Sequence, residues 1–172
     1  SDAPDFSFVQ NNCSYYSGTK AEAEAQLSKF PEVYIWRLRI PFDHLNSPRN
    51  FLTKLLSYPT ILSLQNSVSH RFEFVEACLK TLELHIPYGV YNITNPGSID
   101  AKAVLDMFAR IRPATKSIVE SKTYFDGMDQ FMIKAKAPRS NCVLDQSKLS
   151  SFGITLRPVE QAMEETIEIY QL

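Results

Sequence analysis

Hydrophobic and polar residues alternate along the chain in patterns that predict strands separated by helices. Residues 19–30 are rich in Lys, Ala, Glu, Gln and Leu, which favour a helix, and Pro31 ends it. The aromatic and β-branched run "EVYIWRLRIPF" at 32–42 predicts a buried strand, which Pro41 ends because proline removes a donor from the ladder. The run "YGVYNITN" at 88–95 predicts a second strand.

Apolar residues at helical spacing predict further helices between and after these strands. The segment "SPRNFLTKLLSY" at 47–58 begins with a serine cap and a proline at the first helical position, and its leucines form an apolar face. Helices are also predicted at 72–84, at 100–111 with Asp100 as the cap, over "DQSKLSSFG" and at 158–170, and "TILSLQ" at 60–65 predicts a short strand. The stretch from 112 to 139 is predicted to be rich in loops.

Strands that alternate with helices indicate βαβ units and a parallel sheet. A doubly wound domain usually opens with a strand and a glycine-rich phosphate-binding turn. No such turn occurs in this sequence, whose five glycines are dispersed. The sheet is therefore expected to be incomplete, as in the second half of a larger α/β fold.

Composition narrows the classes of function. A length of 172 residues with 44% hydrophobic and 12% aromatic residues indicates one globular domain with a sizeable core. A net charge of −1 gives no electrostatic signature of nucleic-acid binding, and no apolar run or leader pattern predicts a membrane partner. Cys13, Cys78 and Cys142 lack metal-ligand spacing, and their odd number argues against a disulfide framework. Buried structural thiols and a cytoplasmic location are therefore expected.

The segment "CSYYSGTKAEAEAQL" at 13–27 carries the most specific candidate chemistry. Tyr16 and Lys20 stand one helical turn apart and so share one face of the predicted helix. A phenol is a poor acid near neutral pH unless a fixed cation stabilises its phenolate, which Lys20 would do. The alternative is a packed tyrosine beside a solvated lysine.

Six motifs in register resemble the sugar-nucleotide reductases of the extended short-chain dehydrogenase/reductase class. They are "YYSGTK", "WRLRIPF", "SPRNFLTK", "QNS", "GVYNITNPG" and "APRSNCVLDQSKL" with the following "GITLRPVEQAM". The sequence resembles most the dTDP-4-dehydrorhamnose reductases, and among them the bifunctional 3,5-epimerase/4-reductases that make nucleotide-activated rhamnose. The resemblance runs from about Cys13 to the C-terminus. The glycine-rich turn, the carbonyl-polarising Ser/Thr and the epimerisation cysteine of the family's first half have no counterpart.

The resemblance implies an α/β fold: the C-terminal part of a Rossmann-like doubly wound parallel sheet, plus a small α/β substrate-binding region. Residues 1–43 would end the dinucleotide-binding domain. Residues 44–172 would mainly bind the sugar nucleotide, with strand 88–95 returning to the main sheet. Because the first half of the dinucleotide fold is absent, we expect this chain alone to be inactive. It would form a homodimer or associate with the missing N-terminal half.

The resemblance also implies a reaction, which is the reduction of a nucleotide-linked 4-keto-6-deoxyhexose by NADPH or NADH in rhamnose biosynthesis, with or without 3,5-epimerisation. Tyr16 would protonate the developing alkoxide, and Lys20 would stabilise the phenolate and hold the nicotinamide ribose hydroxyls. Arg39, Ile40 and Pro41 resemble the segment that lies along the nicotinamide. An ordinary strand terminator remains an equal interpretation of Pro41.

Substrate contacts are expected from three further motifs. Lys54 stands where the bifunctional family has an epimerisation acid, although its spacing from Lys20 is one residue short and a plain surface lysine is the alternative. An arginine in a first helical turn opposes the helix dipole unless an anion such as a diphosphate neutralises it. The expected substrate-binding residues are Arg49, Asn50, Asn66, Ser67, Arg139 and Asn141. A solvated side chain is an equal alternative for Arg49, and pairing with Asp145 or a C-terminal glutamate is the alternative for Arg139. No metal site is expected.

A second class of function remains open at this point. A non-catalytic sugar-nucleotide-binding or regulatory module that lacks the cofactor half would explain the absent glycine-rich turn, whereas the Tyr16/Lys20 pair favours an enzyme. The substrate would be dTDP- or UDP-linked in either case. His44, His70 and His85 are interpreted as structural or solvated, and the helix at 158–170 as amphipathic only.

Overall fold

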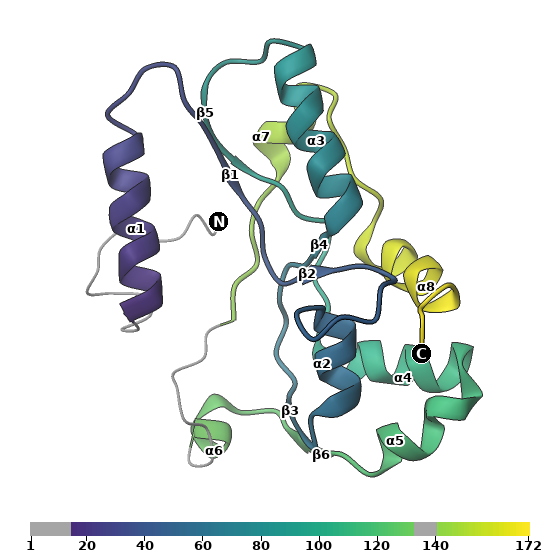
Figure 1. Ribbon diagram of the computed structural model, residues 1–172. Helices are drawn as coiled ribbons and strands as arrows, with labels where there is room; N and C mark the ends of the chain where they lie inside the picture. Colours follow the sequence, from purple (N-terminus) through teal and green to yellow (C-terminus); the bar gives the residue numbers. More distant parts are fainter. Residues whose placement is uncertain (1–14, 133–140) are drawn as a thin grey trace.

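A computed structural model describes residues 15–132 and 141–172 of the chain (Figure 1). In these residues the elements are α1 (Tyr15–Leu27), β1 (Tyr34–Arg37), β2 (Pro41–Phe42), α2 (Phe51–Ser57), β3 (Thr60–Leu62), β4 (Ser69–His70), α3 (Arg71–Glu83), β5 (Gly89–Asn92), α4 (Ala101–Ile111), the 3-10 helix η1 (Pro113–Thr115), α5 (Lys116–Glu120), β6 (Thr123–Phe125), α6 (Met128–Met132), α7 (Ser147–Ser150) and α8 (Val159–Glu168). Strands are separated by helices through much of this order, as the sequence predicts, although β1 is followed directly by β2.

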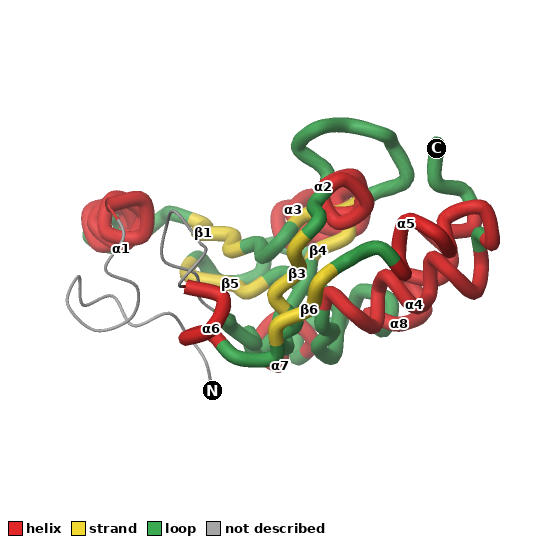
Figure 2. The backbone as a smooth tube through the Cα atoms, turned by 90° about the horizontal axis from the view of Figure 1, so that it is seen from below, coloured by secondary structure: helices red, strands yellow, loops and turns green. Residues whose placement is uncertain are grey.

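The strands pair in parallel. β1 pairs with β5, with Tyr34 opposite Gly89, while β2 pairs with β4 and β3 pairs with β6. Figure 2 shows the paired strands in a row, with α1 at one end and α4, α5 and α8 at the other. The predicted α/β class with parallel strands is therefore confirmed.

Two hydrophobic clusters hold these layers together. The larger one joins β2, β3, α2, α4 and α8, and its fully buried members include Val104, Leu105 and Phe108 at the spacing predicted for α4. Asp100 caps α4, because its side chain accepts a hydrogen bond from the backbone N–H of Ala103 at 2.9 Å. The smaller cluster lies between β1, β5, α3 and α7 and contains Ala77, Cys78, Tyr91, Ile93, Leu149 and Ile154.

The strand predicted at 32–42 is wrong as a single element. β1 ends at Arg37, and Pro41 begins β2 instead of ending a strand. Between them Ile40 has a φ of 42°, in the left-handed region that β-branched residues avoid. The chain changes direction at this residue, so that β1 before it pairs with β5 and β2 after it pairs with β4. Proline is tolerated as the first residue of a strand, where its missing donor is not needed.

Two further predictions require correction. α2 begins at Phe51 with Asn50 as its cap, so the serine at position 47 is not the cap. The stretch after α4 contains α5, β6 and α6 and is not simply a loop.

No helix in residues 15–132 or 141–172 is long and apolar enough to cross a membrane.

Candidate functional site

Tyr16 and Lys20 lie together near the start of α1. The Lys20 Nζ atom is 5.7 Å from the centre of the Tyr16 ring. The Tyr16 side chain is 70% exposed and Lys20 is also exposed, so the phenol is not packed in a core. The structure therefore brings these two predicted residues together on a face that a ligand can reach.

An ion pair fixes the place of α1 beside β1. The Glu24 carboxylate accepts from Arg37 Nε at 2.9 Å and from Arg37 Nη2 at 2.5 Å. α1 and β1 run in opposite directions in Figure 1, so the end of α1 that carries Tyr16 and Lys20 lies toward the carboxyl end of β1. Ligands of open α/β sheets bind outside the carboxyl ends of the strands. The position of the pair suits a binding site.

The chain that leaves β1 enters a compact polar cluster. The backbone N–H of Arg39 donates to Ser69 Oγ at 3.1 Å, and Arg39 Nη2 donates to Asn66 Oδ1 at 2.8 Å. Arg39 is half-buried, and this desolvation lowers the pKa of its guanidinium. Ile40 and Pro41 follow, with Ile40 in its left-handed conformation. Strained backbone of this kind is common at ligand sites.

Asn66 and Ser67 attach the segment that begins at residue 141 to this cluster. Asn66 Oδ1 also accepts from the backbone N–H of Cys142 at 3.1 Å. Ser67 is fully buried, and its hydroxyl accepts from the backbone N–H of Leu144 at 2.9 Å. A direct contact between Ser67 and a nucleotide would require this burial to be undone, so its geometry suits a positioning role.

The predicted residues around α2 are not brought together with Tyr16 and Lys20, because both views place α2 away from α1 (Figures 1 and 2). Asn50 is buried and its amide nitrogen donates to two oxygens of Asp43, at 2.7 and 3.0 Å, while its side-chain oxygen caps α2. Arg49 is exposed and Lys54 is half-buried. Asn50 therefore supports the start of α2, which carries Lys54, while Arg49 directly precedes the cap.

The motif "APRSN" is described only at its end. Asn141 is exposed at the start of the described segment, next to the cluster around Asn66. Arg139 and Cys13 lie outside the described residues, so the diphosphate contact of Arg139 stays a prediction. Within the described ranges, no group of three or more His, Cys, Asp and Glu residues is placed to hold a metal ion.

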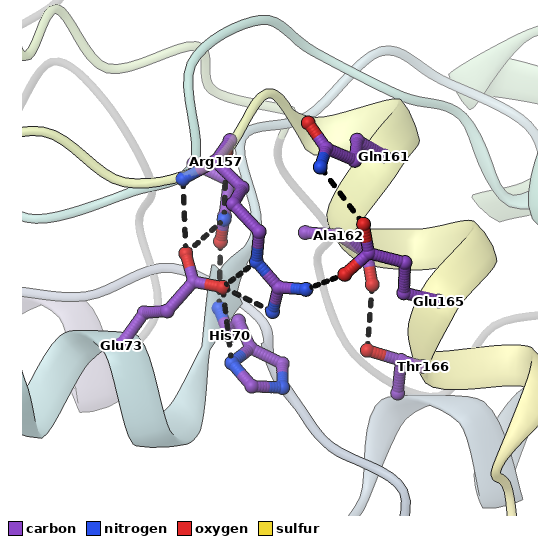
Figure 3. A network of polar contacts seen from close by, with 8 residues as sticks. His70, Glu73, Arg157, Gln161, Ala162, Glu165 and Thr166 are labelled. Atoms are coloured by element: carbon purple, nitrogen blue, oxygen red, sulfur yellow. Dashed lines mark hydrogen bonds and ion pairs between the residues drawn. The ribbon is translucent and has the colours of Figure 1, made fainter.

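A second polar cluster was missed by sequence reasoning (Figure 3). The Glu73 carboxylate accepts from Arg157 Nε at 2.5 Å and from Asn95 Nδ2 at 3.0 Å, and Arg157 also pairs with Glu165. His70 Nδ1 lies 3.5 Å from Glu73 Oε1, and desolvation by burial lowers the pKa of His70. These residues fasten the start of α3 to the chain before α8. Glu73 and Arg157 are 84 residues apart, so no local pattern indicates them.

Known proteins share both sequence and fold with the chain, although no family model matches it. It is 30% identical over 152 residues to the bifunctional dTDP-4-dehydrorhamnose 3,5-epimerase/dTDP-4-dehydrorhamnose reductase of Arabidopsis thaliana, which covers 87% of this chain and 48% of the relative. The L780 UDP-rhamnose synthase of Acanthamoeba polyphaga mimivirus matches its fold with a TM-score of 0.80 and 25% identity, over 91% of this chain and 53% of that one. The chain is a homologue of these nucleotide-sugar epimerases and reductases.

The same fold occurs in a reductase with little sequence identity to the chain. The dTDP-4-dehydrorhamnose reductase of Bacillus anthracis, solved in complex with NADP, matches with a TM-score of 0.65 and 16% identity, over 88% of this chain and 54% of that one. The expected Rossmann-like fold class is thus confirmed. The family resemblance is confirmed by the more similar relatives. The chain spans 48% of the length of the bifunctional Arabidopsis relative and 20% of the length of a trifunctional UDP-glucose 4,6-dehydratase/UDP-4-keto-6-deoxy-D-glucose 3,5-epimerase/UDP-4-keto-L-rhamnose-reductase from the same plant.

Proposed function

We propose that this chain supplies the proton donor and the sugar-nucleotide side of a reductase that acts on a nucleotide-linked 4-keto-6-deoxyhexose. The observation that carries the proposal is the exposed Tyr16/Lys20 pair, with the Lys20 amine 5.7 Å from the phenol ring. It stands on a helix whose first turns lie toward the carboxyl end of a parallel strand. The names of the homologous epimerases and reductases support the substrate class.

NADPH is the proposed reductant, since a reductase of the same fold is known in complex with NADP. When bound, the nicotinamide would supply the hydride. The exposed amine of Lys20 fits a contact with ribose hydroxyls, and the segment Arg39 to Pro41 would lie along the ring. The sequence has no glycine-rich turn for the pyrophosphate, so these residues would hold only the nicotinamide end of the cofactor.

Tyr16 would complete the reduction as a general acid. Negative charge develops on the C4 oxygen of the sugar as the carbonyl is reduced, and the phenol would donate its proton to that oxygen. The Lys20 ammonium beside the ring would stabilise the phenolate that remains, because an opposite charge nearby favours the ionised form. Solvent reaches both side chains and can return the proton.

Lys54 is proposed as the acid of a separate epimerisation step. Moving a proton beside a ketone needs a base on one face and an acid on the other. Lys54 is half-buried on α2, away from α1. Its loss should therefore affect epimerisation and leave the reduction step, which uses Tyr16, unchanged. Lys54→Met should therefore abolish turnover of a substrate that must be epimerised and leave reduction of an already epimerised sugar intact.

The decisive experiment compares Tyr16→Phe with Tyr58→Phe in the longest natural form of the protein that contains this chain. NADPH oxidation is followed with dTDP- and UDP-linked 4-keto-6-deoxyhexoses. Tyr16→Phe should lower kcat by at least about 100-fold, the lower end of general acid catalysis. Tyr58, which directly follows α2, is also exposed, at 48%, and its variant should behave as wild type.

The same assay tests the alternative, a sugar-nucleotide-binding module without catalysis. The lack of a glycine-rich phosphate-binding turn in the sequence favours that function. Tight binding of a UDP- or dTDP-sugar without NADPH oxidation would support the module. Wild-type turnover by Tyr16→Phe would contradict the proposed role of Tyr16.

A further inference from the structure

The helix α1, which carries Tyr16 and Lys20, is mostly exposed. Of the α1 residues whose burial is described, 16–27, only Gly18 is buried, and Ser17, Ala21 and Glu24 are half-buried. Leu27 is 45% exposed. Apolar packing therefore does little to fix the rotation of α1 about its own axis, and polar contacts must contribute.

We propose that Glu24 is a positioning residue, which orients Tyr16 and Lys20 through its ion pair with Arg37. This inference rests on the proposed function. Residues 16, 20 and 24 are spaced by four, so each is rotated about 40° from the next around the helix. Glu24 lies in the contact face of α1, and Lys20 and then Tyr16 follow at its border.

The geometry of the ion pair is suited to fixing a rotation. Arg37 Nε reaches both Glu24 oxygens, at 2.9 and 3.2 Å, and Nη2 reaches Oε1 at 2.5 Å. Several hydrogen bonds between a planar guanidinium and a carboxylate define an orientation as well as a distance. The two side chains are only 11% and 13% exposed. An ion pair so shielded from water adds little stability compared with apolar side chains in the same place. Its contribution is therefore to select one orientation of α1.

The pair also sets the axial position of the phenol. Tyr16 precedes Glu24 by eight residues, a rise of about 12 Å in a helix. β1 ends at Arg37, and the left-handed Ile40 turns the chain soon afterwards. The pair therefore fixes how far along the helix axis the phenol lies from the carboxyl end of β1.

A further effect concerns charge on α1 itself. Glu24 is one turn from Lys20, a spacing at which a glutamate and a lysine attract each other. Arg37 engages both oxygens of Glu24 and so competes with this pairing. The Lys20 ammonium then interacts with the ring of Tyr16 instead of with Glu24.

The test uses Glu24→Ala, Arg37→Lys and the exchange Glu24→Arg with Arg37→Glu, in the longest natural form of the protein. A misplacement of about 1 Å in a catalytic group lowers rates by about 100-fold. Glu24→Ala should therefore lower kcat between about 10- and 100-fold, with an unchanged KM for the sugar nucleotide. Arg37→Lys keeps the positive charge but loses the paired hydrogen bonds of the guanidinium. Its kcat should lie between that of Glu24→Ala and that of the wild type. The exchange should recover part of kcat.

Glu22→Ala is the matched control, since Glu22 is an exposed glutamate of α1 that bonds only to Gln26 in the described structure. The pH profile of kcat gives a readout that a purely structural role would not move. This pH profile should shift in Glu24→Ala, because the Lys20 amine and the Tyr16 phenol are no longer held together. Thermal unfolding separates this effect from a loss of folded protein.

Three outcomes can be told apart. If Tyr16→Phe retains wild-type kcat, the proposed function itself is contradicted. If Tyr16→Phe is inactive while Glu24→Ala keeps both the kcat and the pH profile of wild type, only the positioning inference is overturned. A fall in kcat that the exchange does not restore, in a folded exchange variant with unchanged pH profile, also overturns it.

Discussion

The side-chain hydroxyl of Ser69 accepts a hydrogen bond from the backbone N–H of Arg39 at 3.1 Å. The same hydroxyl donates to the backbone oxygen of Ile93 at 2.8 Å, and Ser69 is fully buried. One serine therefore joins the chain after β1 to the chain after β5, at the point where the two strands separate. It also flanks the left-handed Ile40, whose conformation needs support from its surroundings.

Replacing Ser69 by alanine should destabilise the protein. The change leaves a partly buried backbone donor and a buried acceptor without this partner, and each unsatisfied buried group costs about 1–3 kcal/mol. We expect a fall of at least about 1 kcal/mol in the free energy of unfolding, measured by urea denaturation. Ser57→Ala, which removes an exposed hydroxyl that bonds to Lys54 O, is the control. Equal stability of the two variants would contradict the prediction.

The buried His70 should make stability depend on pH. Desolvation lowers its pKa from the ordinary value of 6.5, with the charges of Arg157 and His44 acting in the same direction and those of Glu73 and Asp43 opposing it. The unfolded chain therefore takes up the proton first as pH falls. The neutral histidine is compatible with full stability above about pH 6.5, and stability should fall below that value.

His70→Asn tests this dependence. Its free energy of unfolding should change less between about pH 7.5 and about pH 5.5 than that of the wild type. His85→Asn removes an exposed histidine and should retain the wild-type slope. The assignment to His70 fails if both variants keep that slope.

The thiol of Cys78 should be unreactive in the folded protein. Burial raises its pKa to about 11, so almost no thiolate is present near neutral pH, and the thiolate is the nucleophile. Alkylation by iodoacetamide, located by mass spectrometry, should modify Cys78 only after denaturant is added. Cys142 is half-buried and provides an internal comparison. Modification of Cys78 in the native protein at the rate of Cys142 would count against its burial.

The chain is expected to associate with itself. α3 exposes an apolar stripe with spacings of three, four and three residues, formed by Phe72, Val75, Leu79 and Leu82, each 48–54% exposed. Apolar patches of this kind are typical of interaction surfaces. Replacing both Val75 and Leu79 by lysine should shift the chain toward monomer in sedimentation.

Leu84→Lys is the control for this prediction, because Leu84 is equally apolar, 56% exposed and off the stripe. It should leave association unchanged. A monodisperse wild-type monomer of 19.6 kDa at high concentration would be the contrary result.

The sequence was sufficient for elements whose pattern of residue types is local. α4 was predicted because its apolar residues recur at helical spacing and Asp100 caps it. The strands β1 and β5 were predicted from aromatic and β-branched runs. The pair Tyr16 and Lys20 follows from helical spacing alone.

Other features depend on residues far away in the chain. The break after β1 is stabilised through Ser69, 30 residues beyond Arg39, so the run at 32–42 does not reveal it. β6 is a short strand that exists by pairing with β3, and its own sequence has too few residues for a periodicity. Serine and asparagine are both good helix caps, and it is the buried contact with Asp43 that selects Asn50.

The separation of the hydrophobic core into two clusters bears on local opening. Trp36 of β1 packs on the smaller cluster, whereas Ile40 packs on the larger one, so the chain passes from one to the other at the break after Arg37. Regions with less buried apolar contact open at lower free energy than the whole protein. The strand that holds α1 can therefore exchange its amide protons without disrupting α4 and α8. The proposed catalytic helix α1 is therefore attached to the part of the described structure that opens at the lower free energy.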